Sequence, residues 1–564
     1  MKTLTTVVIA LALAVATSVA QEISSTAASD NRARMMSPGL QSVSFDQVVQ
    51  RIVQRERETV ERMQHLHPMV ETYIQTLRSD ADHRAIPASD RYFLRRLDLS
   101  DGADGSFMPA PPIIKRLLHG VARLEKTEFD ARGFAQMMLV DDDFQASAYN
   151  FTLVRREFLG EVRCLVLDVQ PKKDTGDGRF MGRIWVEDRD YNIVRLNGTY
   201  SPQRSNSYYF HFDSWRLNLR PGIWLPVYVY SEESGRNARY ARPFHFKSQS
   251  RVWGYDLKQS GRRNEFAEIE IDPLDNVRDQ SQGVQDPTPL QAQRLWERQA
   301  EDNAVERLEK VGLLAPEGEV DKVLETVVYN LAVTSNLDIV PEVRCRVLLT
   351  SPLESFTIGH TIVVSRGLMD VLPDEPALAM VLAHEVGHIA LGHRVDTQLS
   401  FTDRFFFPDE KTLAHLDFNR DHDQEAAADR EALSLLEHSP YKDKLASAGL
   451  FLKTLQARAP ELKNLIHAHL GNGLAGGSAL RMSALLHAAP TLNPRSVDQI
   501  AALPLGARIK LDPWSDRVEL AKNGQERVLF ADEKKPFEVM PFFPHLTRLP
   551  ASSGETVASL PLGK

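Results

Sequence analysis

The spacing of hydrophobic residues changes along this chain, and that change restricts the possible fold more than any other feature. From about residue 92 to residue 271, apolar and polar residues alternate in short runs rich in β-branched and aromatic side chains, which is typical of strands. After about residue 291, apolar residues recur three and four positions apart, as on one face of a helix. The sequence therefore predicts a multidomain α+β protein, with an antiparallel β domain followed by a mainly helical domain. The clearest strand patterns are Phe151–Val154, Cys164–Val169, Gly182–Glu187, Ile193–Leu196, Tyr208–Phe212 and Trp224–Tyr230.

Turn residues and polar stretches divide the 564 residues into several units, because one compact core rarely exceeds 200 residues or so. Before the β domain we expect helices over Phe45–His65 and Val70–Leu77. Near the C-terminus, Asn523-Gly524 between alternating runs predicts a hairpin. The predicted units are a signal peptide (1–20), a helical N-terminal segment (21–90), an antiparallel β domain (91–272), a linker (273–290), a helical domain (291–490) and a C-terminal β appendix (491–564).

Composition and charge exclude several classes of function. Hydrophobic residues make up 43% of the chain and charged residues 25%, as in ordinary globular proteins rather than disordered or collagen-like chains. The formal net charge is −9, so the chain lacks the basic surface that phosphate binding requires. We therefore expect no nucleic-acid partner.

The N-terminus has the pattern of a secretory signal. Lys2 precedes an apolar run, Val7–Ala16, that is too short to cross a bilayer, and Ser18-Val19-Ala20 resembles a cleavage site. No later segment reaches the 18 or so apolar residues that a membrane helix needs. These features predict a soluble, exported protein, periplasmic or extracellular, without a transmembrane segment in the mature chain.

Two cysteines, Cys164 and Cys345, are too few for a disulfide framework or a thiolate metal cluster. Their spacing leaves open whether they pair with each other. Any metal site in this chain must therefore use histidines and carboxylates.

The motif that most clearly indicates a metal-binding or catalytic site is His-Glu-Val-Gly-His at residues 384–388. Residues four apart share a helix face, so His384 and His388 can bind one ion while Glu385 reaches a water bound to it. Buried structural histidines on an apolar helix are the alternative explanation.

A catalytic zinc ion needs a third protein ligand. His393, five residues after His388, should face away from it on an ideal helix, so we expect the ligand from elsewhere. Glu425 and Asp429 lie four apart in Glu-Ala-Ala-Ala-Asp, where the small Ala426–Ala428 permit close helix packing. We expect Glu425 to bind the metal and Asp429 to accept a hydrogen bond from the outer N–H of a ligating histidine.

Together these motifs resemble the M48 family of zinc metallopeptidases, the HtpX-like and Ste24-like group, over Arg344–Ile500. The segment Ile362–Leu368 contributes to the likeness, beside the two motifs. The resemblance implies a gluzincin-like metalloprotease domain with a small sheet, whose edge strand near Thr361–Ser365 pairs with an extended substrate. The chain would be a soluble, exported relative of the family's membrane-bound members.

The resemblance and the residues together predict a zinc metalloendopeptidase with one Zn²⁺ ion per chain. Glu385 would act as general base on a zinc-bound water. His415, His422 and Arg481 are candidates for stabilising the oxyanion. The predicted substrates are proteins or peptides, for example misfolded envelope proteins. The predicted site residues are Glu385 and Asp429 for catalysis and His384, His388 and Glu425 for the metal.

A different class of function remains open. Residues 182–200 resemble part of the half-barrel of periplasmic lipoprotein carriers, a fold that can hold an acyl chain. The protein would then be a periplasmic chaperone or a lipid- or peptide-binding protein with a latent or structural metal site. Glu385 favours catalysis, because a structural metal site needs no base beside its ligands.

Overall fold

The computed structural model describes the chain in segments, and Val49–Lys564 form one compact unit that contains all the strands described. The predicted signal peptide, most of the predicted linker and the Asn523-Gly524 turn lie outside the described residues. Within the described part, no helix has the length and apolar character needed to cross a membrane. The described residues are 44–79, 85–97, 134, 137–140, 144–173, 175, 179–200, 210–233, 245–255, 257, 288–393, 418–475, 482–499, 509–512, 517–520 and 529–550.

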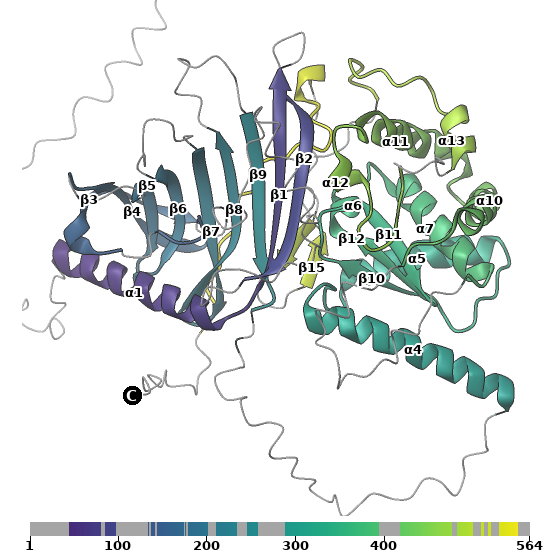
Figure 1. Cartoon of the computed structure of the whole chain (residues 1–564), viewed down its shortest axis with the longest axis horizontal. Coiled ribbons are helices and arrows are strands. Elements are labelled where there is room, and N and C mark those ends of the chain that lie inside the picture. The colour runs from purple at the N-terminus through teal and green to yellow at the C-terminus, as the bar shows by residue number, and fades with distance from the viewer. Residues whose placement is uncertain are drawn as a thin grey trace, which may run out of the picture. The chain divides into compact units, whose positions relative to one another are not determined.

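The first large element of the fold is an antiparallel sheet, which in the described part of the chain has nine strands (Figure 1). Most neighbours in the sheet are also neighbours in the sequence, as the alternating runs separated by turn residues predict. The predicted antiparallel β domain is therefore confirmed. In spatial order the strands are β2 (Ala85–Arg96), β1 (Met69–Ser79), β9 (His245–Trp253), β8 (Ile223–Glu233), β7 (Phe210–Arg220), β6 (Ile193–Tyr200), β5 (Phe180–Glu187), β4 (Val162–Pro171) and β3 (Tyr149–Leu159).

The prediction of a helix over Val70–Leu77 is wrong, since these residues lie in β1. β1 pairs with β2 on one side and β9 on the other, and both of its faces are buried. A strand covered on both faces shows no alternation of apolar and polar residues, so its pattern is easily taken for a short helix. The β-branched residues Val70, Thr72 and Ile74 at every second position favour the strand.

The predicted helix over Phe45–His65 is confirmed as α1, which Figure 1 shows running across the strands of the sheet. Within the compact unit its residues Ile52, Val53 and Met63 are buried. The buried carboxylate of Glu56 accepts two hydrogen bonds from Arg216 on β7, at 2.5 and 2.7 Å. Because an unpartnered buried charge costs several kcal/mol, this pair fixes where α1 sits on the sheet.

The second part of the unit combines helices with a small sheet whose described strands have the order β10-β12-β11-β13. Its helical content and small sheet agree with the predicted fold class. The elements are α4 (Pro289–Val311), α5 (Glu319–Thr334), β10 (Arg344–Leu348), β11 (Glu354–Ile358), β12 (Thr361–Ser365), α6 (Arg366–Val371), α7 (Glu375–Ala390), α10 (His422–His438), α11 (Leu445–Arg458), α12 (Lys463–Ile466), β13 (Asn472–Gly473) and α13 (Ser483–Ala488).

The C-terminal region only partly matches the predicted β appendix. Strand β15 (Arg517–Leu520) pairs with the preceding strand β14 (Ile509–Asp512), so the observed pairing lies upstream of the predicted hairpin. Residues 537–549 then bind to the large sheet instead of forming strands. For example, Val539 N donates to Gln75 Oε1 at 2.9 Å, and Leu549 N donates to Asn218 Oδ1 at 2.9 Å.

The two cysteines are buried and free, Cys164 in β4 and Cys345 in β10. Burial raises the pKa of both thiols, to about 12 for Cys164. Neither thiol has the exposed, electropositive surroundings that a reactive cysteine needs. Both therefore act as small apolar core residues.

Candidate metal centre

Helix α7 carries the His-Glu-Val-Gly-His sequence through the interior of the second part. Asp374 caps its N-terminus by accepting a hydrogen bond from Ala377 N at 3.0 Å, and Pro376 occupies the first turn, where its missing N–H costs nothing. Each of residues 379–389 is buried. A helix covered on all sides is rigid, so His384 and His388 are held in fixed positions.

Helix α10 crosses α7 at close range. A Cβ atom added to Gly387 would lie 2.8 Å from the carbonyl oxygen of Ala428, which is nearer than atoms normally approach. Gly387 is therefore required for the helices to pack this closely, and Ala428 is fully buried at the contact. This packing confirms the expectation that the alanines of α10 permit a close approach, and it brings Glu425 to the histidines.

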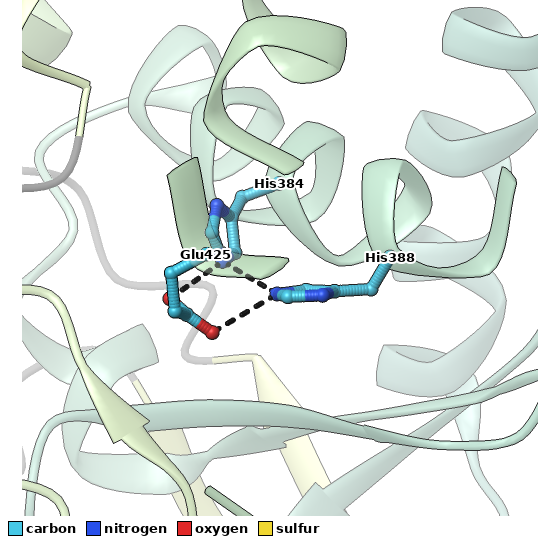
Figure 2. Close-up of side chains that lie close together, drawn as sticks. All are labelled: His384, His388 and Glu425. Carbon is cyan, nitrogen blue, oxygen red and sulfur yellow. Dashed lines mark hydrogen bonds and ion pairs between the residues drawn. The ribbon is translucent and has the colours of Figure 1, made fainter. Parts of the chain in front are cut away.

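The structure brings His384, His388 and Glu425 together (Figure 2). One ligand atom from each lies within 4.8 Å of the others. The two histidine Nε2 atoms are 3.0 Å apart, and the Glu425 oxygens lie 3.3 Å from His384 Nε2 and 3.1 Å from His388 Nε2. Tetrahedral zinc with bonds of about 2.0–2.1 Å separates its ligand atoms by about 3.3 Å. The spacing of these side chains therefore suits a small tetrahedral cation.

The chemistry of the three groups also suits a bound cation. His384 Nδ1 lies 2.8 Å from Asp429 Oδ1, and an ionised carboxylate only accepts hydrogen bonds. A neutral His384 that donates to Asp429 carries its proton on Nδ1 and turns a lone pair on Nε2 toward the shared space. Glu425 turns carboxylate oxygens toward the same space. Two acceptors that face each other in a buried site are stabilised by a positive ion between them.

Asp429 is held in place from both of its oxygens. Oδ1 faces His384, while Oδ2 accepts a hydrogen bond from the backbone N–H of Met482 at 2.8 Å. The carboxylate is thereby fixed between α7 and the segment that leads into α13. This is the geometry by which a carboxylate orients a metal-binding histidine and increases its basicity.

The expectation that His393 faces away from the site is wrong. Its Nδ1 lies 2.9 Å from His388 Nδ1. Helix α7 ends at Ala390, and Gly392 has a φ of +68°, so the chain turns back and the angle of an ideal helix no longer applies. Burial and the neighbouring His388 lower the pKa of His393, which favours a neutral ring. A neutral ring can accept a hydrogen bond from His388 or donate one to it.

Glu385 points to strand β11, where Ser355 Oγ donates a hydrogen bond to Glu385 Oε1 at 2.7 Å. Both side chains are buried, with 1% and 2% of their surface exposed for Ser355 and Glu385. The sequence predicted no catalytic role for Ser355, because no motif links it to Glu385, 30 positions away. The hydrogen bond fixes the direction of the Glu385 carboxylate.

The expectation that Thr361–Ser365 is an edge strand is wrong, because β12 lies between β10 and β11. In the described residues, β11 has β12 on one side, while on the other side β13 pairs only with Glu354 and Ser355. The pattern of residues shows that Thr361–Ser365 forms a strand, but not which of its neighbours pair with it. Within the described residues, the outer edge of β11 at Phe356–Ile358 is the part of this sheet beside Glu385 that has no strand partner.

Arg420, just before α10, also lies beside β11, and the sequence predicted no role for it. Its Nη2 donates to Thr357 Oγ1 on β11 at 2.9 Å. Burial lowers the pKa of Arg420, and the negative charges of Glu385 and Glu425 oppose this effect. The positive charge of the Arg420 side chain is therefore held near both the β11 edge and Glu385.

The earlier candidates for oxyanion stabilisation fare differently. His415 and Arg481 lie outside the described residues. His422 is the first residue of α10 and is exposed. Arg420, which was not among these candidates, places a positive charge near Glu385.

Comparison with known proteins agrees with this geometry. Residues 318–495 match the model of Peptidase family M48. This range runs from just before α5 to just beyond α13 and contains all three candidate ligands. No curated protein matches the chain.

Solved structures similar to the chain have low sequence identity. A domain from Vibrio parahaemolyticus described as an outer membrane lipoprotein-sorting protein is 11% identical, with 39% of this chain and 97% of that one covered and a TM-score of 0.20. A LolA superfamily protein from Nitrosomonas europaea is 13% identical, covers 37% of this chain and 92% of that one, and has a TM-score of 0.19. Likenesses at this level carry no activity from those proteins to this chain.

Proposed function

We propose, on the premise that residues 318–495 are a domain of peptidase family M48, that this protein is a zinc-dependent endopeptidase acting on protein substrates. The observation that carries the proposal is the convergence of His384, His388 and Glu425 next to Glu385. A metal site with a purely structural role has no need of a buried carboxylate beside it. A catalytic one does, because peptide hydrolysis requires a base.

In this proposal, His384, His388 and Glu425 hold the zinc ion, and Asp429 keeps His384 in the tautomer that binds metal. When bound, zinc lowers the pKa of a bound water toward about 7 and polarises the scissile carbonyl. Glu385 takes the proton from the attacking water and passes it to the leaving amine. Ser355 fixes the direction of the Glu385 carboxylate through its hydrogen bond.

The extended substrate is proposed to pair with the outer edge of β11 at Phe356–Ile358. Backbone hydrogen bonds along a strand edge bind polypeptides without regard to their side chains, which suits an endopeptidase with many protein substrates. Arg420 lies at this edge through Thr357 and adds positive charge beside the reacting carbonyl. The physical support is the position of this edge, one residue away from Ser355.

We also propose that the protein is exported and acts on proteins in the periplasm or outside the cell. The support is the signal-like pattern of residues 1–20. N-terminal sequencing of the protein recovered outside the cytoplasm should find a chain that begins near Gln21.

The activity is tested with fluorescein-labelled casein and the purified full-length protein. We expect cleavage that a zinc chelator abolishes and added Zn²⁺ restores. Glu385→Gln should bind one zinc ion as the native protein does but lose activity by at least about 100-fold, as for removal of a general base. Glu437→Gln changes an exposed glutamate of α10 and serves as the matched control, with native activity.

Cleavage that resists the chelator, or no cleavage by a protein with one bound zinc ion, would contradict the proposal. The second result would favour a chaperone or binding protein with a latent or structural metal site.

A further inference from the structure

A short segment of the second part, residues 463–473, lies between the large sheet and strand β11. It comprises α12, the loop that follows it and β13, and we call it the clamp segment. The large sheet contacts it on one side through β2, and β11 contacts it on the other. It therefore joins the large sheet to β11, the strand whose Ser355 donates a hydrogen bond to Glu385.

On the sheet side, Asp90 of β2 caps the N-terminus of α12. Its Oδ1 accepts a hydrogen bond from Asn464 N at 2.9 Å, and its Oδ2 accepts one from Leu465 N at 2.8 Å. The Asn464 side chain donates back to the Asp90 backbone carbonyl at 2.9 Å. Asp90 is only 7% exposed, so these bonds form away from water, where they are strongest.

Tyr92, two residues along the same strand, makes the second contact. Its ring stacks on His469 with the ring centres 5.0 Å apart and the planes at 30°. Asp90 and Tyr92 point to the same face of β2, as residues at every second position of a strand do. The clamp segment is thus held by two adjacent side chains of one strand.

On the catalytic side, Glu354 holds the same segment. This carboxylate is 1% exposed and accepts hydrogen bonds from His469 N and Leu470 N, both at 2.9 Å. Asn472 and Gly473 of β13 then pair with Ser355 and Glu354. Ser355 is the residue that donates to Glu385.

We propose that the large sheet positions the general base of the peptidase reaction, with Asp90 as the positioning residue that acts through the clamp segment, β11 and Ser355. This inference rests on the proposed function. The sheet would then act on catalysis indirectly, through the clamp segment and β11. The candidate metal ligands His384, His388 and Glu425 belong to α7 and α10, outside the clamp segment and β11, although Phe418 N, shortly before α10, donates to Leu470 O of the clamp segment at 2.9 Å.

This arrangement predicts that catalysis and metal binding respond differently to a change at Asp90. When the cap is removed, the clamp segment loosens, β13 no longer holds β11, and Ser355 no longer fixes the Glu385 carboxylate. A base misplaced by about 1 Å costs up to about 100-fold in rate. We therefore expect kcat to fall about 10- to 100-fold in Asp90→Ala, with KM changed less than kcat and zinc affinity unchanged.

The test compares full-length variants by casein hydrolysis, zinc affinity and amide hydrogen exchange. Asp90→Ala should lower kcat and speed exchange in residues 463–473 but not in α7. Ser355→Ala should lower kcat without changing exchange in the clamp segment. Adding Asp90→Ala to Ser355→Ala should cost little more, because both changes act through one path.

Arg78→Ala is the matched control. Arg78 of β1 also reaches from the large sheet to the second part, but its bond to Glu461 is 3.5 Å long and its side chain is 59% exposed. Such pairs contribute little, so native kcat and native exchange are expected. Asp90→Asn, which keeps the side-chain carbonyl oxygen as an acceptor, should fall between the native protein and Asp90→Ala.

Native kcat in Asp90→Ala despite faster exchange in the clamp segment would overturn the proposal, as would unchanged exchange. Loss of zinc affinity in parallel with kcat would also overturn it, because the substitution would then disturb the whole site and not the position of the base alone. If Asp90→Ala does not fold, Tyr92→Leu removes the second contact and is measured in the same way. If the native protein does not cleave casein, the proposed function fails, and exchange at β11 in Asp90→Ala still decides whether the sheet holds that strand.

Discussion

The close contact between α7 and α10 allows a test of how the metal centre is built. We predict that Gly387→Ala weakens zinc binding while the protein stays folded. The added Cβ would lie 2.8 Å from the Ala428 carbonyl oxygen and 3.3 Å from its Cα. Atoms in contact are normally about 3.5 Å apart, so the helices must separate by roughly 0.5 Å or more. Zinc–ligand distances tolerate only about 0.2 Å, so Glu425 would be drawn out of reach.

The magnitude follows from two opposing effects. Overpacking of this kind costs about 1–3 kcal/mol. Replacing a helical glycine by alanine returns about 1 kcal/mol, so the net change in unfolding free energy should be small. If the strain falls on the metal-bound geometry, zinc binding weakens by about 5- to 150-fold.

Zinc affinity is measured by competition with a coloured chelator, and folding by circular dichroism. Ala428→Gly is an informative control, because it removes the Ala428 side chain but leaves the carbonyl oxygen that the new Cβ meets. The double variant should therefore bind zinc as weakly as Gly387→Ala. Zinc affinity within twofold of native in folded Gly387→Ala would refute the reasoning, and so would full rescue by Ala428→Gly.

Two further predictions concern the carboxylates of Asp429 and Asp321. Asp429→Asn should weaken zinc binding about 10- to 100-fold, because the amide can turn its NH2 toward His384 Nδ1 and favour the wrong tautomer; chelator competition measures this, and native affinity would contradict it. Burial raises the pKa of Asp321 from 3.8 to about 6, so the folded protein binds this proton more tightly than the unfolded chain. The stabilising contribution is complete below pH 3.8 and is lost as the pH rises through about 6. The melting temperature of Asp321→Asn should therefore depend less on pH across this range than that of the native protein, and parallel curves would exclude the assignment.

Helices α7 and α10, and the side chains that each presents on one face, were predictable because the residues concerned lie close together in the sequence. The His384–His388 spacing and the Glu425–Asp429 spacing each describe one face of one helix, and helix geometry is local. The approach of the two helices was also predictable from the alanines of α10. The prediction that the motifs at residues 384–388 and 425–429 form one site came from the chemistry of zinc, which needs a third protein ligand.

The errors occurred where the structure depends on distant partners or on the end of an element. β1 was taken for a helix because both of its faces are buried, so its apolar and polar residues do not alternate. His393 was placed on an ideal helix that in fact ends at Ala390. The order of strands around β12 could not be read from its own residues, since the pairing of a strand depends on its neighbours. The sequence predicted no role for Ser355 or Arg420, because a single serine or arginine gains its role only from the side chains beside it.

The proposed zinc ligands and the proposed general base of this protein are supported by different parts of the fold. His384, His388 and Glu425 depend on two helices packed at a glycine, and that contact lies wholly within residues 318–495, which match the model of Peptidase family M48. The direction of Glu385 depends on Ser355, whose strand is bounded by β13 and hence by the clamp segment. A change in the large sheet could therefore alter the position of the base without releasing the metal. If Asp90→Ala lowers kcat at native zinc affinity, the sheet has the position needed to control activity, whatever it binds.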